Sequence, residues 1–179
     1  MKILDFADLH IPQESRIEVD PATEAAREAA LRSLSSVGRS RNSLQERLVE
    51  RGHELEVLVP LLDRFEEVGL LNDRELARAI ARARFTERGR SRRAIANELE
   101  RKGFDELDIE EALSQIDEED EIETVRALAR KRLAKDTKGQ RQDRIRRALG
   151  HLCRKGYSQG MAMKCIMEVL HQEDADTAV

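Results

Sequence analysis

Lysine and arginine side chains gather in two stretches of this 179-residue chain. Residues 124–164 hold thirteen of them against two aspartates, a net charge of +11, and residues 78–102 hold nine against three glutamates, a net charge of +6. Guanidinium and ammonium groups bind phosphate and carboxylate groups, so these stretches predict a contact surface for an anionic partner. The candidate contact residues are Arg88, Arg90, Arg92, Arg93, Arg101, Lys102, Arg130, Lys131, Arg132, Lys135, Arg141, Arg144, Arg146, Arg147, Arg154 and Lys155.

A third stretch is acidic, because residues 104–123 carry eleven carboxylates and neither Lys nor Arg. A charge run on a single helix is usually a solvated face. A net charge of +11 over three helices repels itself, however, and calls for a neutralising anion. Two sources stay open at this point: the acidic stretch of the same chain, or an external polyanion or acidic protein surface.

The sequence offers no catalytic or metal-binding pattern. It lacks the phosphate loop GxxxxGKS, the dinucleotide motif GxGxxG and the zinc motif HExxH, and its four histidines are scattered. The acidic stretch lacks the spaced oxygens and the turn glycine of a calcium loop. We therefore expect no enzyme activity, no cofactor and no metal.

Aromatic residues make up only 3% of the chain, which limits recognition of nucleic acid by base stacking. The helical register described below assigns Phe65 to the core and Phe104 and Tyr157 to helix caps. Stacking is therefore not expected to dominate. A basic helical surface follows phosphates instead, which predicts contacts that are independent of base sequence and weaken as salt rises.

A sequence frame that recurs three times positions these charges. Leu48–His53 reads LVERGH, Leu99–Phe104 reads LERKGF and Leu152–Tyr157 reads LCRKGY. A leucine four positions before a glycine, with a basic residue directly before the glycine, predicts a helix that ends in a Schellman cap. In that cap the glycine is left-handed and the residue after it packs on the leucine, as Phe104 would on Leu99.

Apolar residues stand at the same offsets from all three glycines in steps of three and four, which predicts a helix on either side of each. Further helices are expected at residues 21–35, 73–87 and 120–135, and Ser40 and Ser91, each twelve residues before its glycine, are expected N-caps. The fold class is therefore all-α, with three tandem three-helix repeats packed end to end. The expected domains are a leader at 1–20, poorly ordered or extended, the repeats at 21–68, 69–118 and 119–171, and a polar tail at 172–179.

No apolar run approaches the roughly 18 residues that span a bilayer. Asp5 and Asp8 interrupt the apolar start of the chain, which is therefore not a signal peptide. Cys153 and Cys165 have no CxxC spacing, and we expect both to be small core side chains. These features predict a cytoplasmic protein without a membrane partner.

The segment Gly69–Leu113, GLLNDRELARAIARARFTERGRSRRAIANELERKGFDELDIEEAL, resembles the RecX family of bacterial regulators of the RecA recombinase. In this region that family shows a turn with Asp, a basic helix, a glycine, and then I…L..KG and I..AL. The third unit is similar to the family's C-terminal repeat and the first unit to its opening. The resemblance covers about residues 25–170.

The resemblance implies an elongated, curved, right-handed helical array that lies in the groove of the RecA filament on single-stranded DNA. There it would restrain filament extension, strand exchange and ATP hydrolysis. It also implies a monomer whose partners are RecA and single-stranded DNA, the latter bound weakly and without sequence preference. Arg144, Arg146 and Arg147 would be exposed contacts on the helix before the third cap.

Two other interpretations stay open. A helix-turn-helix transcription factor fits the recurring pair of helices, but the positions that would read bases are acidic or apolar: Glu54, Leu55, Glu106 and Leu107. A sequence-independent nucleic-acid binder or a helical protein-interaction scaffold, without specificity for RecA, also fits the basic surface.

Overall fold

The computed structural model describes residues 20–36, 38–135 and 140–177, and all regular secondary structure within them is helical. The all-α prediction is therefore confirmed. The expected leader lies outside the described residues apart from Asp20. The helices are α1 (Pro21–Ser36), α2 (Arg41–Val49), α3 (Leu55–Glu67), α4 (Asp73–Thr86), α5 (Arg92–Arg101), α6 (Glu106–Ser114), α7 (Glu118–Ala134), α8 (Arg141–Arg154) and α9 (Gln159–Thr177).

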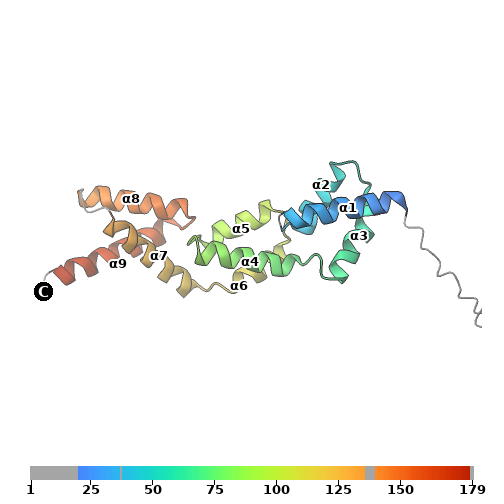
Figure 1. The fold of residues 1–179 in the computed structure, drawn as a ribbon. Helices are drawn as coiled ribbons and strands as arrows, with labels where there is room; N and C mark the ends of the chain where they lie inside the picture. The colour runs from blue at the N-terminus through green and yellow to red at the C-terminus, as the bar shows by residue number, and fades with distance from the viewer. Residues whose placement is uncertain (1–19, 37, 136–139, 178–179) are drawn as a thin grey trace, which may run out of the picture.

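The helices form three units with separate hydrophobic cores, which follow one another along an elongated molecule (Figure 1). The first unit is α1–α3, the second α4–α6 and the third α7–α9. The leucine four positions before each glycine is fully buried, at Leu48, Leu99 and Leu152. The apolar register predicted from the sequence is thus confirmed. Cores this small are marginal alone, so the contacts between units matter.

All three predicted Schellman caps are present. Gly52, Gly103 and Gly156 have φ of +90°, +78° and +101°. The N–H of the residue after each glycine donates to the carbonyl of the leucine, with N···O distances of 3.1, 3.2 and 3.3 Å. Leu99 and Phe104 are buried in the same core, as the cap requires.

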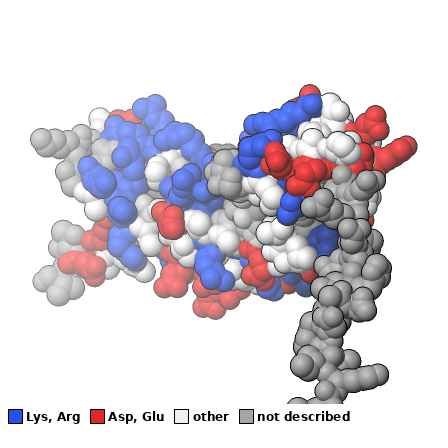
Figure 2. All heavy atoms as spheres, turned by 45° about the vertical axis from the view of Figure 1, so that its right-hand side comes forward, with Lys and Arg blue, Asp and Glu red and all other residues white. Residues whose placement is uncertain are grey.

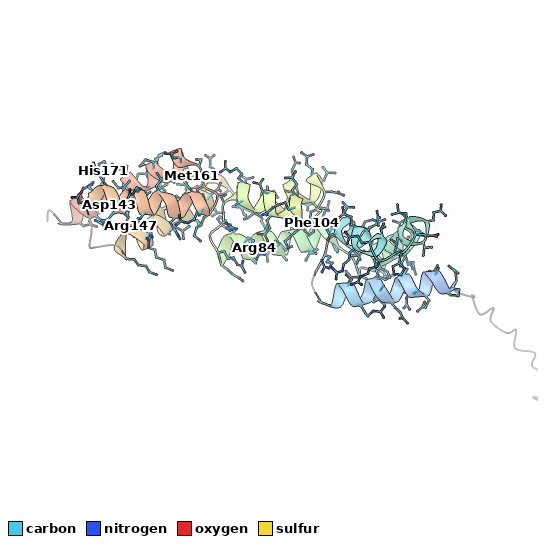
Figure 3. The ribbon with its side chains drawn as sticks, turned by 90° about the horizontal axis from the view of Figure 1, so that it is seen from above. Arg84, Phe104, Asp143, Arg147, Met161 and His171 are labelled. Carbon is cyan, nitrogen blue, oxygen red and sulfur yellow. The ribbon has the colours of Figure 1, made fainter. Side chains whose placement is uncertain are left out.

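The same caps join one unit to the next. At the second joint the N–H of Ser91 donates to the carbonyl of Lys155 at 3.0 Å. At the first joint the Ser40 hydroxyl donates to the carbonyl of Lys102 at 2.6 Å. Figure 3 shows Phe104, the last residue of that cap, where the second unit adjoins the first. The C-terminal end of α8 therefore meets the N-terminal end of α5, and α5 meets α2 in the same way.

Each joint is also held by a carboxylate from the following unit. Ser40 and Ser91 accept hydrogen bonds from the N–H of the residue three positions later, which confirms both as N-caps. Asp73 accepts from the N–H of Arg41 at 2.9 Å, and Glu121 accepts from the N–H of Arg92 at 2.9 Å. The donors at the start of α2 and α5 thus have partners in two units.

Three details differ from the sequence analysis. Cys165 is buried as expected, but Cys153 is exposed. On α8 the buried face is formed by Ala148 and Leu152, four residues apart, and Cys153 directly follows Leu152 and lies off that face. Helix α9 continues to Thr177, so residues 172–177 of the expected polar tail are helical. Leu71, placed with the second repeat by its position, packs in the core of the first unit.

Gly52 and Gly156 form a matched pair for testing the joint. Both are left-handed, but a Cβ on Gly52 would meet no atom within 4 Å, whereas a Cβ on Gly156 would overlap Ala94 Cβ and Ser91 Oγ. Gly52→Ala should cost about 1 kcal/mol of unfolding free energy, from backbone strain alone. Gly156→Ala should cost about 2 kcal/mol more, from the overlap. Urea unfolding of both variants measures the difference, and equal losses would contradict the joint.

Asp73 gives the first joint a pH dependence. Burial raises the pKa of its carboxyl to about 6, the N–H of Arg41 lowers it, and Asp108, Glu66 and Asp105 raise it. The folded state therefore holds this proton more tightly than the unfolded chain, and the contribution of Asp73 to stability falls as pH rises from about 4 to about 6. Asp73→Asn keeps one acceptor for Arg41 and cannot ionise. Its unfolding free energy relative to the original chain should rise between pH 4.5 and pH 7, and a constant difference in urea titrations would refute the assignment.

Candidate nucleic-acid interface

The basic residues predicted from the sequence lie mainly on α5, α7 and α8. Figure 2 shows Lys and Arg side chains along the upper edge of the molecule in its left and central parts, and most of the Asp and Glu side chains of these parts toward the lower edge, with some Lys and Arg among them. In Figure 1 the upper edge is the side on which α5 and α8 lie. We call this surface the basic face. Its cations differ in what else they contact, which decides their availability to a partner.

Three of the candidate cations belong to the second joint. Arg90 Nη1 donates to the carbonyl of Arg154 at 3.0 Å, Arg93 Nη2 donates to the carbonyl of Gly156 at 3.1 Å, and Lys155 Nζ donates to the carbonyl of Arg88. These donors satisfy carbonyls at the C-terminal ends of α8 and α4, where cations also complement the helix dipole. Replacing any of them would change the joint as well as the basic face.

Other candidates pair within the third unit. Arg141 contacts Asp174 at 2.8 Å, Arg144 contacts Glu173 at 3.3 Å, and both acids lie on α9. Arg144 also donates to the carbonyl of Leu133, and its side chain is only 22% exposed. The expectation that Arg144 is an exposed contact is therefore wrong, because α9 continues past the residues expected to end it and covers this side chain.

Weaker contacts hold a few more candidates. Arg146 pairs with Asp143 one turn earlier at 3.0 Å and is 79% exposed, so this pair leaves its guanidinium accessible. Arg101 donates to the carbonyl of Asn97, and Arg130 donates to Gln172 at 3.5 Å. Arg132 and Arg147 also make interactions inside the protein.

The ion pairs that the acidic stretch forms in the described residues go to the second unit, and one glutamate makes them. Glu111 on α6 pairs with Arg74 and Arg78 on α4, at 2.7 and 2.5 Å. The carboxylates that pair with α7 and α8 instead include Glu168, which contacts Arg126 at 2.8 Å, together with the α9 acids named above. Carboxylates of the same chain thus neutralise some of the basic residues but not all of them. The charge runs in the sequence did not indicate that those paired with α7 and α8 lie on α9.

Six candidate cations make neither a hydrogen bond nor an ion pair through their side chains within the described part of the chain. They come from α5, α7 and α8 and from the turns that follow α4, α5 and α7, and they lie in both the second and the third unit. All of them except Arg92, which is half-buried, are exposed, and their charge is open to an external anion. These six are Arg88, Arg92, Lys102, Lys131, Lys135 and Arg154.

A groove of about 690 Å³ opens between the second and third units. One wall is the C-terminal end of α4, with Phe85 and Arg88, and the other is α7, with Leu128 and Lys131. Gly89, which also lines the groove, has φ of +55°, and a Cβ there would lie 3.0 Å from Leu128 Cδ1, so a larger residue would be strained and would displace Leu128.

The electrostatics of the groove are positive. Burial lowers the pKa of His151, and Lys155, Arg132 and Arg154 lower it further. Burial likewise lowers the pKa of Lys155, with Arg90 and Lys131 adding to the effect. Both shifts show cations close enough to repel one another, a repulsion that a bound anion would relieve. The sequence analysis missed this groove, and the only signal for it was Phe85, the one aromatic between residues 66 and 103.

The positions that a helix-turn-helix regulator would use for bases carry the wrong chemistry. Glu54 and Glu106 are exposed at the starts of α3 and α6, and Leu55 and Leu107 are 50% and 78% exposed. Carboxylates there would repel phosphates. Across the described residues no group of His, Cys, Asp and Glu could hold a metal ion, and none of the helices is long and apolar enough to cross a bilayer.

Comparisons with known proteins give consistent matches. Family models described as "RecX, second three-helix domain" and "RecX, third three-helix domain" match residues 72–113 and 118–166. A "Regulatory protein RecX" from Streptomyces coelicolor is 43% identical over 158 residues, which cover 88% of this chain and 84% of that protein. One of the same name from Thermobifida fusca is 38% identical over 151 residues, covering 84% and 82%. A crystal structure of RecX from Lactobacillus salivarius has the same fold, with a TM-score of 0.72 at 21% identity over 83% of this chain and 96% of that one.

Arg144 and Arg146 should respond differently to loss of charge. Arg144→Gln removes a partly buried ion pair and a hydrogen bond to Leu133, so it should lower the unfolding free energy by about 1 kcal/mol. Arg146→Gln removes one exposed pair and should change it by less than about 0.5 kcal/mol. Thermal melts followed by circular dichroism distinguish the two, and equal stability of both variants would contradict the role assigned to Arg144.

Proposed function

Because this chain belongs to the RecX family, we propose that it is a negative regulator of RecA that lies in the groove of the RecA filament on single-stranded DNA. There it inhibits filament extension, strand exchange and ATP hydrolysis. RecA and the DNA strand within its filament are the proposed partners, and the regulator acts as a monomer. The observation that carries this proposal is the basic face, which continues across the joint between the second and third units.

The length of the array supports an extended target. Helices α2, α5 and α8 have 9, 10 and 14 residues and meet end to end. At 1.5 Å per residue they span roughly 50 Å, far more than a compact ligand needs. A filament presents repeated anionic groups over such a length. An elongated array with charges at fixed spacing matches a repeating partner better than a single small site would.

The charge of the face supports phosphate contact. Cations on both sides of the second joint have no carboxylate partner in the described residues, so phosphates are free to fill that role. Such contacts carry no base sequence, and binding should weaken steeply with salt. The carboxylates on the opposite edge would repel phosphates, so the DNA strand is expected to contact the basic face only.

RecA's ATP hydrolysis on single-stranded DNA tests the proposal. With the regulator well below RecA in amount, hydrolysis should fall, because blocking filament extension affects many protomers at once. Inhibition that appears only when the regulator saturates the DNA would indicate competition for the strand and would overturn filament regulation.

A charge-matched pair of variants tests the basic face itself. Arg146→Gln combined with Arg154→Gln should require at least about fivefold more protein for half-inhibition, because the double change removes two exposed guanidinium groups from α8. Arg82→Gln combined with Lys164→Gln alters the net charge equally on exposed positions of α4 and α9. Melting temperatures of both should stay near that of the original chain. Equal loss of inhibition in the two variants would reject α8 as the contact.

A further inference from the structure

The groove between the second and third units combines an apolar wall with cations. We propose that it holds one nucleotide of a single DNA strand, with the base against the apolar wall and the flanking phosphates on the cations. This inference rests on the proposed function, which brings a strand to the basic face. Its test, however, contains no RecA, so the two can fail separately.

The apolar wall suits a nucleobase. Among the described aromatic side chains, Phe65, Phe104 and Tyr157 are buried, and Phe85 alone is only partly so. Phe85 packs against the second core on one side and lines the groove on the other. Ala127 and Leu128 of α7 line it as well. A base has an apolar face that stacks on such surfaces whatever its identity.

Cations stand where the phosphates of that nucleotide would lie. Lys131 lies on α7 and Lys135 is the C-cap of that helix, one turn further, so the two share a side of it, and Arg88 comes from the segment after α4. None of the three pairs with a described carboxylate, and Glu87 is the one acidic residue among those that line the groove. Phosphates bridging the two walls would relieve the repulsion among these cations.

His151 adds a neutral polar group at the same place. Its lowered pKa leaves the imidazole uncharged near pH 7, so it has one hydrogen-bond donor and one acceptor to offer. A base edge offers both kinds of partner. An acidic peptide would use the cations but leave the Phe85 wall and His151 without partners. The volume of about 690 Å³ lies within the range of small-ligand sites.

The experiment compares two 12-nucleotide strands with the full chain by fluorescence anisotropy. One is oligodeoxyadenylate, and the other has abasic sites at every position and therefore the same phosphates. The normal strand should bind about tenfold more tightly, because one stacked base contributes that much, while both lose affinity with salt. Equal affinity of the two strands would overturn the proposal.

Two exposed alanines supply the variant and its control. Ala127→Glu puts a carboxylate into the groove, and Ala79→Glu puts the same group on α4 outside it. Ala127→Glu should bind the normal strand as weakly as the original chain binds the abasic one, while Ala79→Glu should stay within about twofold of the original. Phe85→Leu keeps an apolar wall but removes the aromatic ring, so it should reduce the difference in affinity between the normal and the abasic strand. Equal losses for the two alanine variants would overturn the assignment.

Competitors identify the source of the nucleotide. Displacement of the strand by deoxyadenosine monophosphate supports the groove and marks it as open to free nucleotides, and resistance to that competitor supports a nucleotide held as part of a strand. Displacement by polyglutamate as effective as by unlabelled strand would overturn the proposal in favour of an acidic protein. If the protein inhibits RecA but binds the normal and abasic strands equally, only the nucleotide site in the groove is rejected. If it prefers the normal strand but does not inhibit RecA, only the proposed filament regulation is rejected.

Discussion

The end-to-end docking of one helix cap on another is the interaction on which the rest of this structure depends. A helix end leaves carbonyls without partners, and a helix start leaves N–H groups without partners. The joints bring the two together: the carbonyl of Lys155 accepts from Ser91, and the carbonyl of Lys102 accepts from Ser40. Each unit thus satisfies backbone groups of its neighbour. The alignment also places the negative end of one helix dipole against the positive end of the next.

The two outer ends of the described array differ from its two joints. Gly52 forms the same left-handed cap as the other two glycines, but a Cβ on it would meet no atom of the described residues within 4 Å. At the other end, α8 begins at Arg141 with Gln140 as its N-cap, and Arg144 stands where the other repeats have serine. In the joints, this serine contacts the C-terminal cap of a helix in the next unit. No described helix cap docks at the start of α8, and α8 begins about one turn earlier than α2 and α5 do relative to their glycines. The described residues thus form three units and two joints, with different residues at each outer end.

The parts of this fold that depend on neighbouring residues could be predicted from the sequence, and the parts that depend on contacts between distant helices could not. Schellman caps and serine N-caps follow from residues within one turn, so Gly103 and Ser91 could be assigned from spacing. Which cations a partner can reach depends on helices far along the chain. Arg144 looked exposed because the acids of α9 that cover it follow 29 residues later. The groove was missed for the same reason, since Phe85 and Leu128 line one groove only when two units dock.

The second joint and the groove share residues, which links binding to shape. Lys155 lies in the groove and donates to the carbonyl of Arg88 across the joint, and Gly89 both lines the groove and accepts a hydrogen bond from the Tyr157 hydroxyl at 3.2 Å. Any ligand held between these walls contacts both units at once. It therefore stabilises the docked arrangement by its own binding free energy. Because the basic face crosses this joint, the spacing of its charges on α5 and α8 is fixed most firmly when the groove is filled.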